Sequence, residues 1–138
     1  MNTKLTDALR NNKDELKTWQ ETMHKHPELS MQEENTAKYI ADLIKSFGGY
    51  ELAEGVGKYG MVASLKAGDG DKAIGIRADF DALPISEDNN LPYKSTIEGR
   101  SHLCGHDGHA AMALGAAKYL AETKNFNGTV RFIFQPGE

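Results

Sequence analysis

The sequence contains a single cysteine, Cys104, in 138 residues. A framework of internal disulfides is therefore excluded, and the thiol is left as core filler, a metal ligand or a nucleophile. No apolar run approaches the roughly 18 residues that span a bilayer, and the polar start of the chain lacks the apolar region of a secretory signal peptide. We therefore expect a cytoplasmic protein that does not associate with membranes.

Basic residues are also too few for a nucleic-acid surface. The chain has 16 Lys and Arg against 20 Asp and Glu, a formal net charge of −4, and the two signs are interspersed. Binding to nucleic acid or to an anionic membrane is therefore not expected. With 39% hydrophobic residues, the chain is long enough for one compact core and too short for two ordinary domains.

The first segment has the apolar spacing of an amphipathic helix. Leu16, Trp19 and Met23 recur at helical intervals and predict a helix over residues 3–25. Pro27 ends it, because proline does not continue a helix.

A second helix is predicted directly afterwards. Ser30 and Glu33 have the spacing of a capping box, in which each side chain bonds a free backbone amide at a helix start. The apolar stripe of this helix consists of Ala37, Ile40, Ile44 and Phe47. Gly48 and Gly49 end it, because glycine adopts the left-handed conformation that closes helices.

Shorter apolar runs follow and predict strands. They are residues 61–65, 73–78 and 129–134, with a helix predicted over 108–122 and a long functional loop over 79–101. We expect the first two strands to form a hairpin or to be neighbours, because a Gly-Asp turn joins them. The order ααββαβ with apolar strands predicts an α/β layered sheet with helices on both faces. The sequence ends just beyond the last strand, so we expect a partial domain.

Residues 102–109 (HLCGHDGH) concentrate three histidines, a cysteine and an aspartate. In a helix, His102, His106 and His109 would share a face, whereas in an extended segment His102, Cys104 and His106 would point the same way. Glycines disfavour a helix here, so Cys104 and His106 are the predicted metal ligands, and thiolate with imidazole suits zinc and similar ions. The role of His109 is left open. Near a helix end, His24 and His26 are interpreted as structural.

Three acidic residues follow predicted strands. Asp79 and Asp81 come directly after one strand and can both face the crevice at its carboxyl end, where either a ligand-orienting role or a solvated pair is possible. Glu138 holds the matching place after the last strand. A carboxylate beside a metal-bound water is the usual general base of hydrolysis.

A thiol enzyme is the competing interpretation of the same residues. Cys104, His106 and Asp107 would then be nucleophile, base and orienting acid. Residues this close in sequence rarely form a triad, because triad members usually come from separate elements. The metal site is therefore preferred.

The strings RADFDALPI (residues 77–85), HLCGHDGH (102–109) and FQPGE (134–138) resemble the aminoacylase and hippurate hydrolase family of metal-dependent amidohydrolases. HPELS (26–30) fits a helix junction of the same family, so the resemblance spans essentially the whole chain. It implies a zinc-exopeptidase-like α/β catalytic domain, of which residues 1–138 are the N-terminal portion. It also implies two divalent ions, zinc, manganese, cobalt or nickel, and a small-molecule N-acyl amino acid substrate such as hippurate.

The resemblance also assigns roles to single residues. Cys104 and His106 match metal ligands, Glu138 matches the general base, and Asp81 matches an acidic residue that supports the site. Asp79 falls where distant relatives have a ligand histidine. The family's other ligands and its inserted dimerisation domain would lie beyond Glu138, so the 138-residue chain alone is expected to be inactive and the whole protein a homo-oligomer. A non-catalytic fragment or binding protein, and a peptidase or dipeptidase of the same family, stay open as alternatives.

Overall fold

The structure is a computed structural model that describes residues 3–138. Its elements, in chain order, are α1 (Thr3–Asn11), α2 (Lys13–Lys25), α3 (Glu34–Phe47), β1 (Glu51–Val56), β2 (Gly60–Ala67), β3 (Ala73–Asp79), α4 (His106–Thr123) and β4 (Gly128–Gln135). None of the described helices is both long and apolar enough to cross a membrane.

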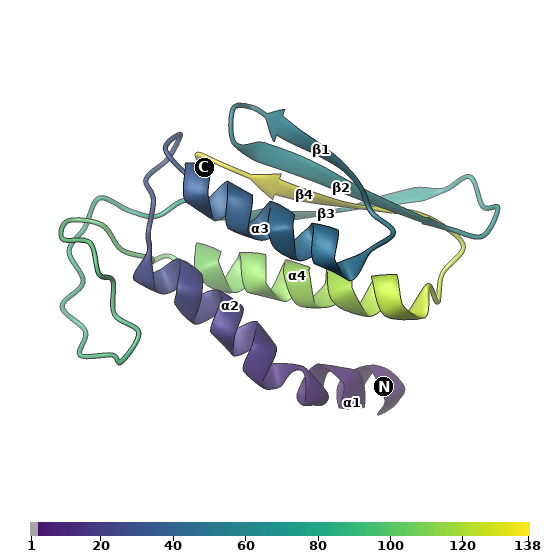
Figure 1. Cartoon of the computed structure of the whole chain (residues 1–138), viewed down its shortest axis with the longest axis horizontal. Coiled ribbons are helices and arrows are strands. Elements are labelled where there is room, and N and C mark those ends of the chain that lie inside the picture. The colour runs from purple at the N-terminus through teal and green to yellow at the C-terminus, as the bar shows by residue number, and fades with distance from the viewer. Residues whose placement is uncertain (1–2) are drawn as a thin grey trace.

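The four strands form one mixed sheet in the order β1-β2-β4-β3 (Figure 1). β2 pairs antiparallel with β1 and with β4, whereas β3 pairs parallel with β4. The strands predicted over residues 61–65 and 73–78 correspond to β2 and β3, so the prediction that they are neighbours is wrong. α4 connects β3 to the parallel β4, and β4 inserts between β2 and β3.

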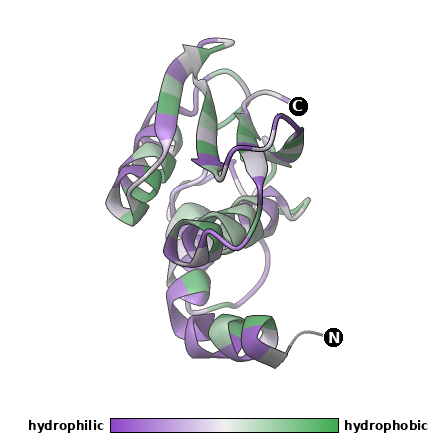
Figure 2. Ribbon diagram, turned by 90° about the vertical axis from the view of Figure 1, so that its right-hand side faces the viewer, coloured by the Kyte–Doolittle hydropathy of each residue, from purple (hydrophilic) through white to green (hydrophobic). Residues whose placement is uncertain are grey.

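The helices form layers against the sheet. α3 and α4 pack on one face, and α1 and α2 lie farther from it (Figure 1). Hydrophobic and hydrophilic residues alternate along the strands (Figure 2), and β4 accordingly alternates between buried and more exposed positions. The α/β layered fold is confirmed. Helices were predicted on both faces of the sheet, but the described helices cover only one. The reason is that this alternation gives the sheet a single apolar face.

The core lies between that face and the helices. Its largest fully buried apolar side chains are Phe80, Phe132, Phe134, Ile40, Ile44, Leu65 and Leu114. The predicted stripe on α3 is confirmed for Ala37, Ile40 and Ile44, which are buried, while Phe47 stacks at its rim against Trp19.

Two features of the N-terminal half differ from the prediction. The single helix over residues 3–25 is divided at Asn12, whose short polar side chain competes with helical backbone bonds. β1 has no counterpart in the sequence analysis, because this edge strand is almost wholly exposed and shows no apolar run.

The predicted capping box at Ser30 and Glu33 is wrong. The free amides of α3 are instead satisfied by Glu28, whose carboxylate accepts hydrogen bonds from the backbone N–H groups of Asn35 and Thr36 at 3.1 and 2.5 Å. The Asn35 amide and the Thr36 hydroxyl donate to the same carboxylate. One long side chain thus replaces the cap, and this leaves Ser30 and Glu33 free for other contacts.

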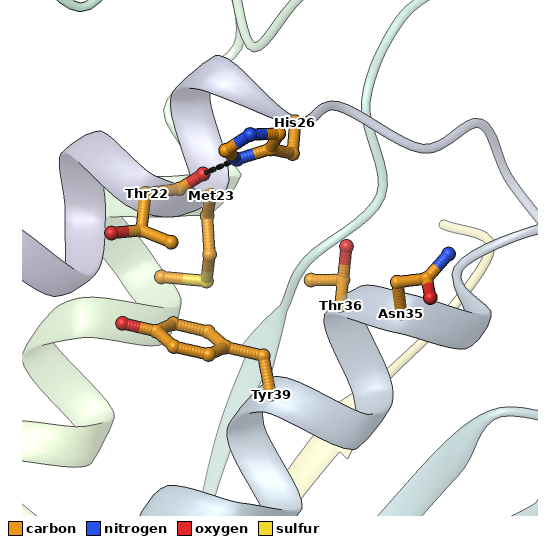
Figure 3. Close-up of a pocket in the computed structure, with 6 residues that line it drawn as sticks. All are labelled: Thr22, Met23, His26, Asn35, Thr36 and Tyr39. Carbon is orange, nitrogen blue, oxygen red and sulfur yellow. Dashed lines mark hydrogen bonds between the residues drawn. The ribbon is translucent and has the colours of Figure 1, made fainter.

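A small cavity of about 150 Å³ lies between α2 and α3 (Figure 3). Met23 and Tyr39 line it, and His26 lies at the end of α2 with its Nδ1 2.8 Å from the carbonyl oxygen of Thr22. This contact ties His26 to the last turn of its own helix.

Candidate metal centre

The carboxyl ends of β3 and β4 bring the predicted site residues to one edge of the sheet. Asp79 ends β3 and pairs in register with Gln135 at the end of β4. α4 begins beside them at His106, after Gly105 in the left-handed conformation at φ 94°. Side chains from three segments distant in sequence therefore meet at the place where open α/β sheets bind ligands.

His106 lies at the centre of this group and is 4% exposed. Its Nδ1 is 3.0 Å from both the backbone oxygen and Oδ1 of Asp81. Both neighbours are acceptors, so Nδ1 donates to Asp81 and Nε2 is the nitrogen left to face a metal. This is the arrangement in which a carboxylate orients a metal-binding histidine.

Two carboxylates face the free nitrogen of His106. Oε2 of Glu138 is 3.4 Å from Nε2, and Oδ2 of Asp79 is 3.8 Å from it. The Glu138 side chain is half exposed, and the structure places it in contact with His106 and, at 4.0 Å, with Arg77. Glu138 is thus close to the predicted ligand and open to solvent.

Asp79 is buried and surrounded by positive or protonated groups. Its Oδ1 is 2.7 Å from Nδ1 of His109, and its Oδ2 is 2.8 Å from Arg77. Burial raises the pKa of the Asp79 carboxyl, but the hydrogen bond from His109 and the charges of His106 and Arg77 outweigh burial and hold this pKa below its ordinary value. Asp79 is therefore an ionised oxygen donor at neutral pH.

These residues fit a divalent cation. Among the described residues, one ligand atom each from Asp79, His106 and His109 lie within 4.8 Å of one another. Imidazole and carboxylate are ligands of zinc and of related ions. Cys104 is exposed and lies outside this compact group, although its thiol precedes His106 by only two residues. The structure thus joins His106 with Asp79 and His109, while the ligand role of Cys104 stays a prediction.

The segment between α2 and α3 braces the same edge. The Ser30 hydroxyl donates to Oδ2 of Asp81 at 2.6 Å, and Ala82 donates its backbone N–H to the carbonyl oxygen of Glu28 at 2.8 Å. Asp81 is therefore held on one side by Ser30 and bonded to His106 on the other. The supporting role of Asp81 stays a prediction, and its contact with His106 is the geometry that such a role needs.

A second cluster of polar residues is buried behind the centre and was not found from the sequence. His24 lies between Asp107, 2.8 Å from Nδ1, and Glu87, 3.1 Å from Nε2. Burial lowers the pKa of His24, but the hydrogen bonds to Glu87 and Asp107 outweigh burial and raise it above its ordinary value. His24 is thus held in the structure by buried contacts with Glu87 and Asp107. The only sign of this in the sequence is the position of His24 beside the apolar face of its helix.

His102 lies beside this cluster, with its ring centroid 6.3 Å from that of His24. Neither ring nitrogen has a hydrogen-bond partner among the described residues, and burial lowers the pKa of His102 to about 4. His102 is therefore neutral at pH 7 and is not a member of the compact donor group.

Comparison with known proteins shows which family this chain resembles. Residues 75–138 match Peptidase family M20/M25/M40. The chain is 54% identical over 116 residues to a hippurate hydrolase of Campylobacter jejuni, covering 84% of this chain and 30% of that protein. It is 43% identical over 130 residues to an N-acyl-L-amino acid amidohydrolase of Geobacillus stearothermophilus, covering 91% and 35%.

A solved structure from Bacillus subtilis, a dinuclear metal binding peptidase of the M20 family, superposes with a TM-score of 0.85 at 41% identity. The match covers 91% of this chain and 35% of that one. The chain thus spans about a third of the length of the relatives that it matches. Residues 75–138 thus match Peptidase family M20/M25/M40, and the identities and the fold make the chain similar to members of that family.

Proposed function

We propose that the protein formed by this chain and its continuation is a metal-dependent amidohydrolase that cleaves N-acyl amino acids, hippurate among them, into a carboxylic acid and an amino acid. One observation supports this reaction most directly. The Glu138 carboxylate lies 3.4 Å from Nε2 of His106, the imidazole nitrogen that Asp81 leaves free for a metal. A carboxylate in this position is suited to be the general base of a hydrolase.

The residues of this chain would have separate roles in the reaction. His106 and Cys104 are the proposed ligands from this chain, and Asp79 is a further oxygen donor that lies in one compact group with His106. Two divalent ions, zinc, manganese, cobalt or nickel, would supply Lewis acidity to the acyl carbonyl when bound. Asp81 would keep His106 in the binding tautomer.

Glu138 would move the proton. Its half-exposed carboxylate would accept a proton from the attacking water and then donate it to the nitrogen of the leaving amino acid. Carbonyl attack would break the amide C–N bond and release the acid and the amine. Asp81 would act only through His106, because its own carboxylate is engaged with His106 and Ser30.

This chain provides fewer predicted ligands than a catalytic site needs. Cys104, His106 and Asp79 are three candidates, which is the number that one catalytic zinc ion typically has, whereas the proposed centre holds two ions. We therefore expect the 138-residue chain alone to be inactive. The whole protein would be a homo-oligomer, as the family resemblance implies.

The test compares this chain with the same sequence extended through the reading frame that follows Glu138, called the extended chain below. Bound metal is measured by elemental analysis and hydrolysis with hippurate, other N-acyl amino acids and dipeptides. We expect only the extended chain to bind about two ions per chain and to hydrolyse substrate, with N-acyl amino acids preferred over dipeptides. An extended chain that binds metal and cleaves dipeptides alone would favour a peptidase, and one that binds no metal would refute the proposal.

A further inference from the structure

Glu33 is a fully buried carboxylate that the proposed reaction does not use. Its exposed fraction is 0%, and the structure records no ion pair for it among the described residues. One oxygen, Oε2, has no hydrogen-bond partner in the described part of the chain. Burying a carboxylate this way is unfavourable, because it loses its hydration without gaining a neighbouring charge.

The other oxygen of Glu33 makes one long-range contact. Oε1 accepts a hydrogen bond of 2.8 Å from the backbone N–H of Gly137. Gly137 precedes Glu138 and has a φ of 57°, in the left-handed region. The carboxylate at the start of α3 is thus joined to the backbone that precedes the proposed general base.

The packing around Gly137 restricts it further. A Cβ atom at this position would lie 2.8 Å from Sδ of Met31, so only glycine fits without a shift of the neighbour. On the other side of the segment, a Cβ at Gly60 would lie 2.9 Å from Pro136. Residues 136 and 137 are therefore held between β2 and the segment before α3, with Glu33 supplying the hydrogen bond.

Glu138 depends on this backbone for its position. Its side chain is half exposed, and its contacts to His106 and Arg77 are 3.4 and 4.0 Å long. Such contacts fix a side chain less firmly than short hydrogen bonds do. A displacement of about 1 Å at a reacting group can lower a rate on the order of 10²-fold.

We propose that Glu33 is a positioning residue that holds the Gly137 amide and thereby places Glu138 against the metal-facing nitrogen of His106. The inference rests on the proposed function for its catalytic consequence. The structural part, a Gly137 amide protected by Glu33, is independent of any activity.

Two variants of the extended chain separate positioning from folding. E33M keeps the length of the side chain and removes the acceptor, whereas E33Q keeps an oxygen that can accept the Gly137 N–H. We expect E33M to lower kcat on the order of tenfold to a hundredfold, with KM and bound metal changed little. We expect E33Q to keep kcat within about threefold of the unchanged protein, because the hydrogen bond survives.

Glu28 supplies the matched control. It lies in the same segment and caps α3 through Asn35 and Thr36, and in the described part of the chain its side chain has no hydrogen bond or ion pair with residues 137 and 138. We expect E28M to lower the melting temperature while leaving kcat near that of the unchanged protein. E33M, in contrast, should lower kcat.

Hydrogen exchange of the Gly137 amide, measured by NMR without metal, gives a readout that is independent of catalysis. Exchange should be slow in the unchanged protein and in E33Q, and at least about tenfold faster in E33M. Unaltered exchange and kcat in E33M would overturn the inference. The inference would also be overturned if E33M and E33Q lowered kcat, bound metal and melting temperature to the same extent as each other, because this result would indicate a structural role. If the unchanged extended chain hydrolyses no N-acyl amino acid, the proposed function fails. The exchange rates still show whether Glu33 protects the Gly137 amide.

Discussion

Nδ1 of His106 lies 3.0 Å from Oδ1 of Asp81 and equally far from the Asp81 backbone oxygen. A single residue therefore presents two acceptors to one imidazole nitrogen. This orients the imidazole so that Nε2 faces Asp79 and Glu138. The centre is thus prearranged by the protein before any ion binds.

Replacing Asp81 by asparagine tests this arrangement. D81N keeps the size of the side chain and the backbone acceptor but removes the negative charge that makes His106 a better ligand. We expect the metal affinity of the extended chain to fall about tenfold, the lower end of the effect of such supporting carboxylates. The affinity is measured by competition with a chelator of known strength.

Ser30 provides the control for this variant. S30A removes the hydroxyl that donates to Oδ2 of Asp81 but leaves the contact of Asp81 with His106 intact. A smaller loss of affinity is expected than in D81N. Equal affinities in D81N and the unchanged protein would contradict the orienting role.

Cys104 and His109 are two competing candidates for the ligand beside His106. Nδ1 of His109 is engaged by Asp79 at 2.7 Å, whereas the Cys104 thiol is exposed and without such a tie. The family resemblance implies Cys104 as the ligand, so we expect C104A to bind less metal than the unchanged extended chain, and H109N to retain more metal than C104A. Elemental analysis after dialysis measures both, and a normal stoichiometry in C104A would remove Cys104 from the site.

Much of the fold was predictable because helix and strand periods depend on nearby residues. The α3 stripe of Ala37, Ile40 and Ile44 and its end at Gly48 follow from spacing alone. The position of β4 between β2 and β3 did not, because strand order depends on how the α4 crossover packs. Local turn residues cannot encode that packing.

The site was predictable to a similar extent. Asp79 and Asp81 both approach His106, since these residues lie at the end of β3, just after it, and at the start of α4. The partners of His24 and Glu33 were not predictable. Each is a buried contact between residues more than 60 positions apart, and no short sequence pattern records it.

Two glycines of α4 give a matched test of helix packing. A Cβ at Gly115 would lie 2.7 Å from Cδ2 of Leu16 on α2, whereas a Cβ at Gly108 would meet nothing within 4 Å. We expect G115A to lower the free energy of unfolding by about 1–3 kcal/mol through overpacking. G108A should raise it by up to about 1 kcal/mol, since alanine favours the helix. Urea denaturation measures both, and a stabilised G115A would contradict the close approach of α2 and α4.

His24 predicts a pH dependence of stability. Because its folded pKa is raised, its contribution is fully present below the ordinary value of about 6.5 and is lost as pH rises through the folded pKa. The pKa of Glu87 is held low: burial raises it, but the bonds from Ser95 and His24 outweigh burial, so its contribution is lost only in acid. We expect H24Q to cost about 3 kcal/mol near pH 6 and less above pH 8. Urea denaturation with a chelator present measures both; a cost that grows above pH 6.5 would reverse the assigned direction.

Glu138 gives the sharpest test of the proposed reaction. E138Q preserves the shape of the side chain and the backbone that Glu33 holds, but an amide cannot accept the proton of the attacking water. Because Glu138 is not one of the proposed ligands from this chain, the extended E138Q protein should keep its bound metal while kcat falls on the order of 10²–10⁴-fold, the usual contribution of a general base. Metal analysis and hippurate hydrolysis on the same preparation separate this outcome from loss of the centre. If metal and kcat fall together, Glu138 is a ligand or a structural residue; if neither falls, the proton must be taken by another group, and the 3.4 Å approach of Glu138 to His106 has no catalytic role.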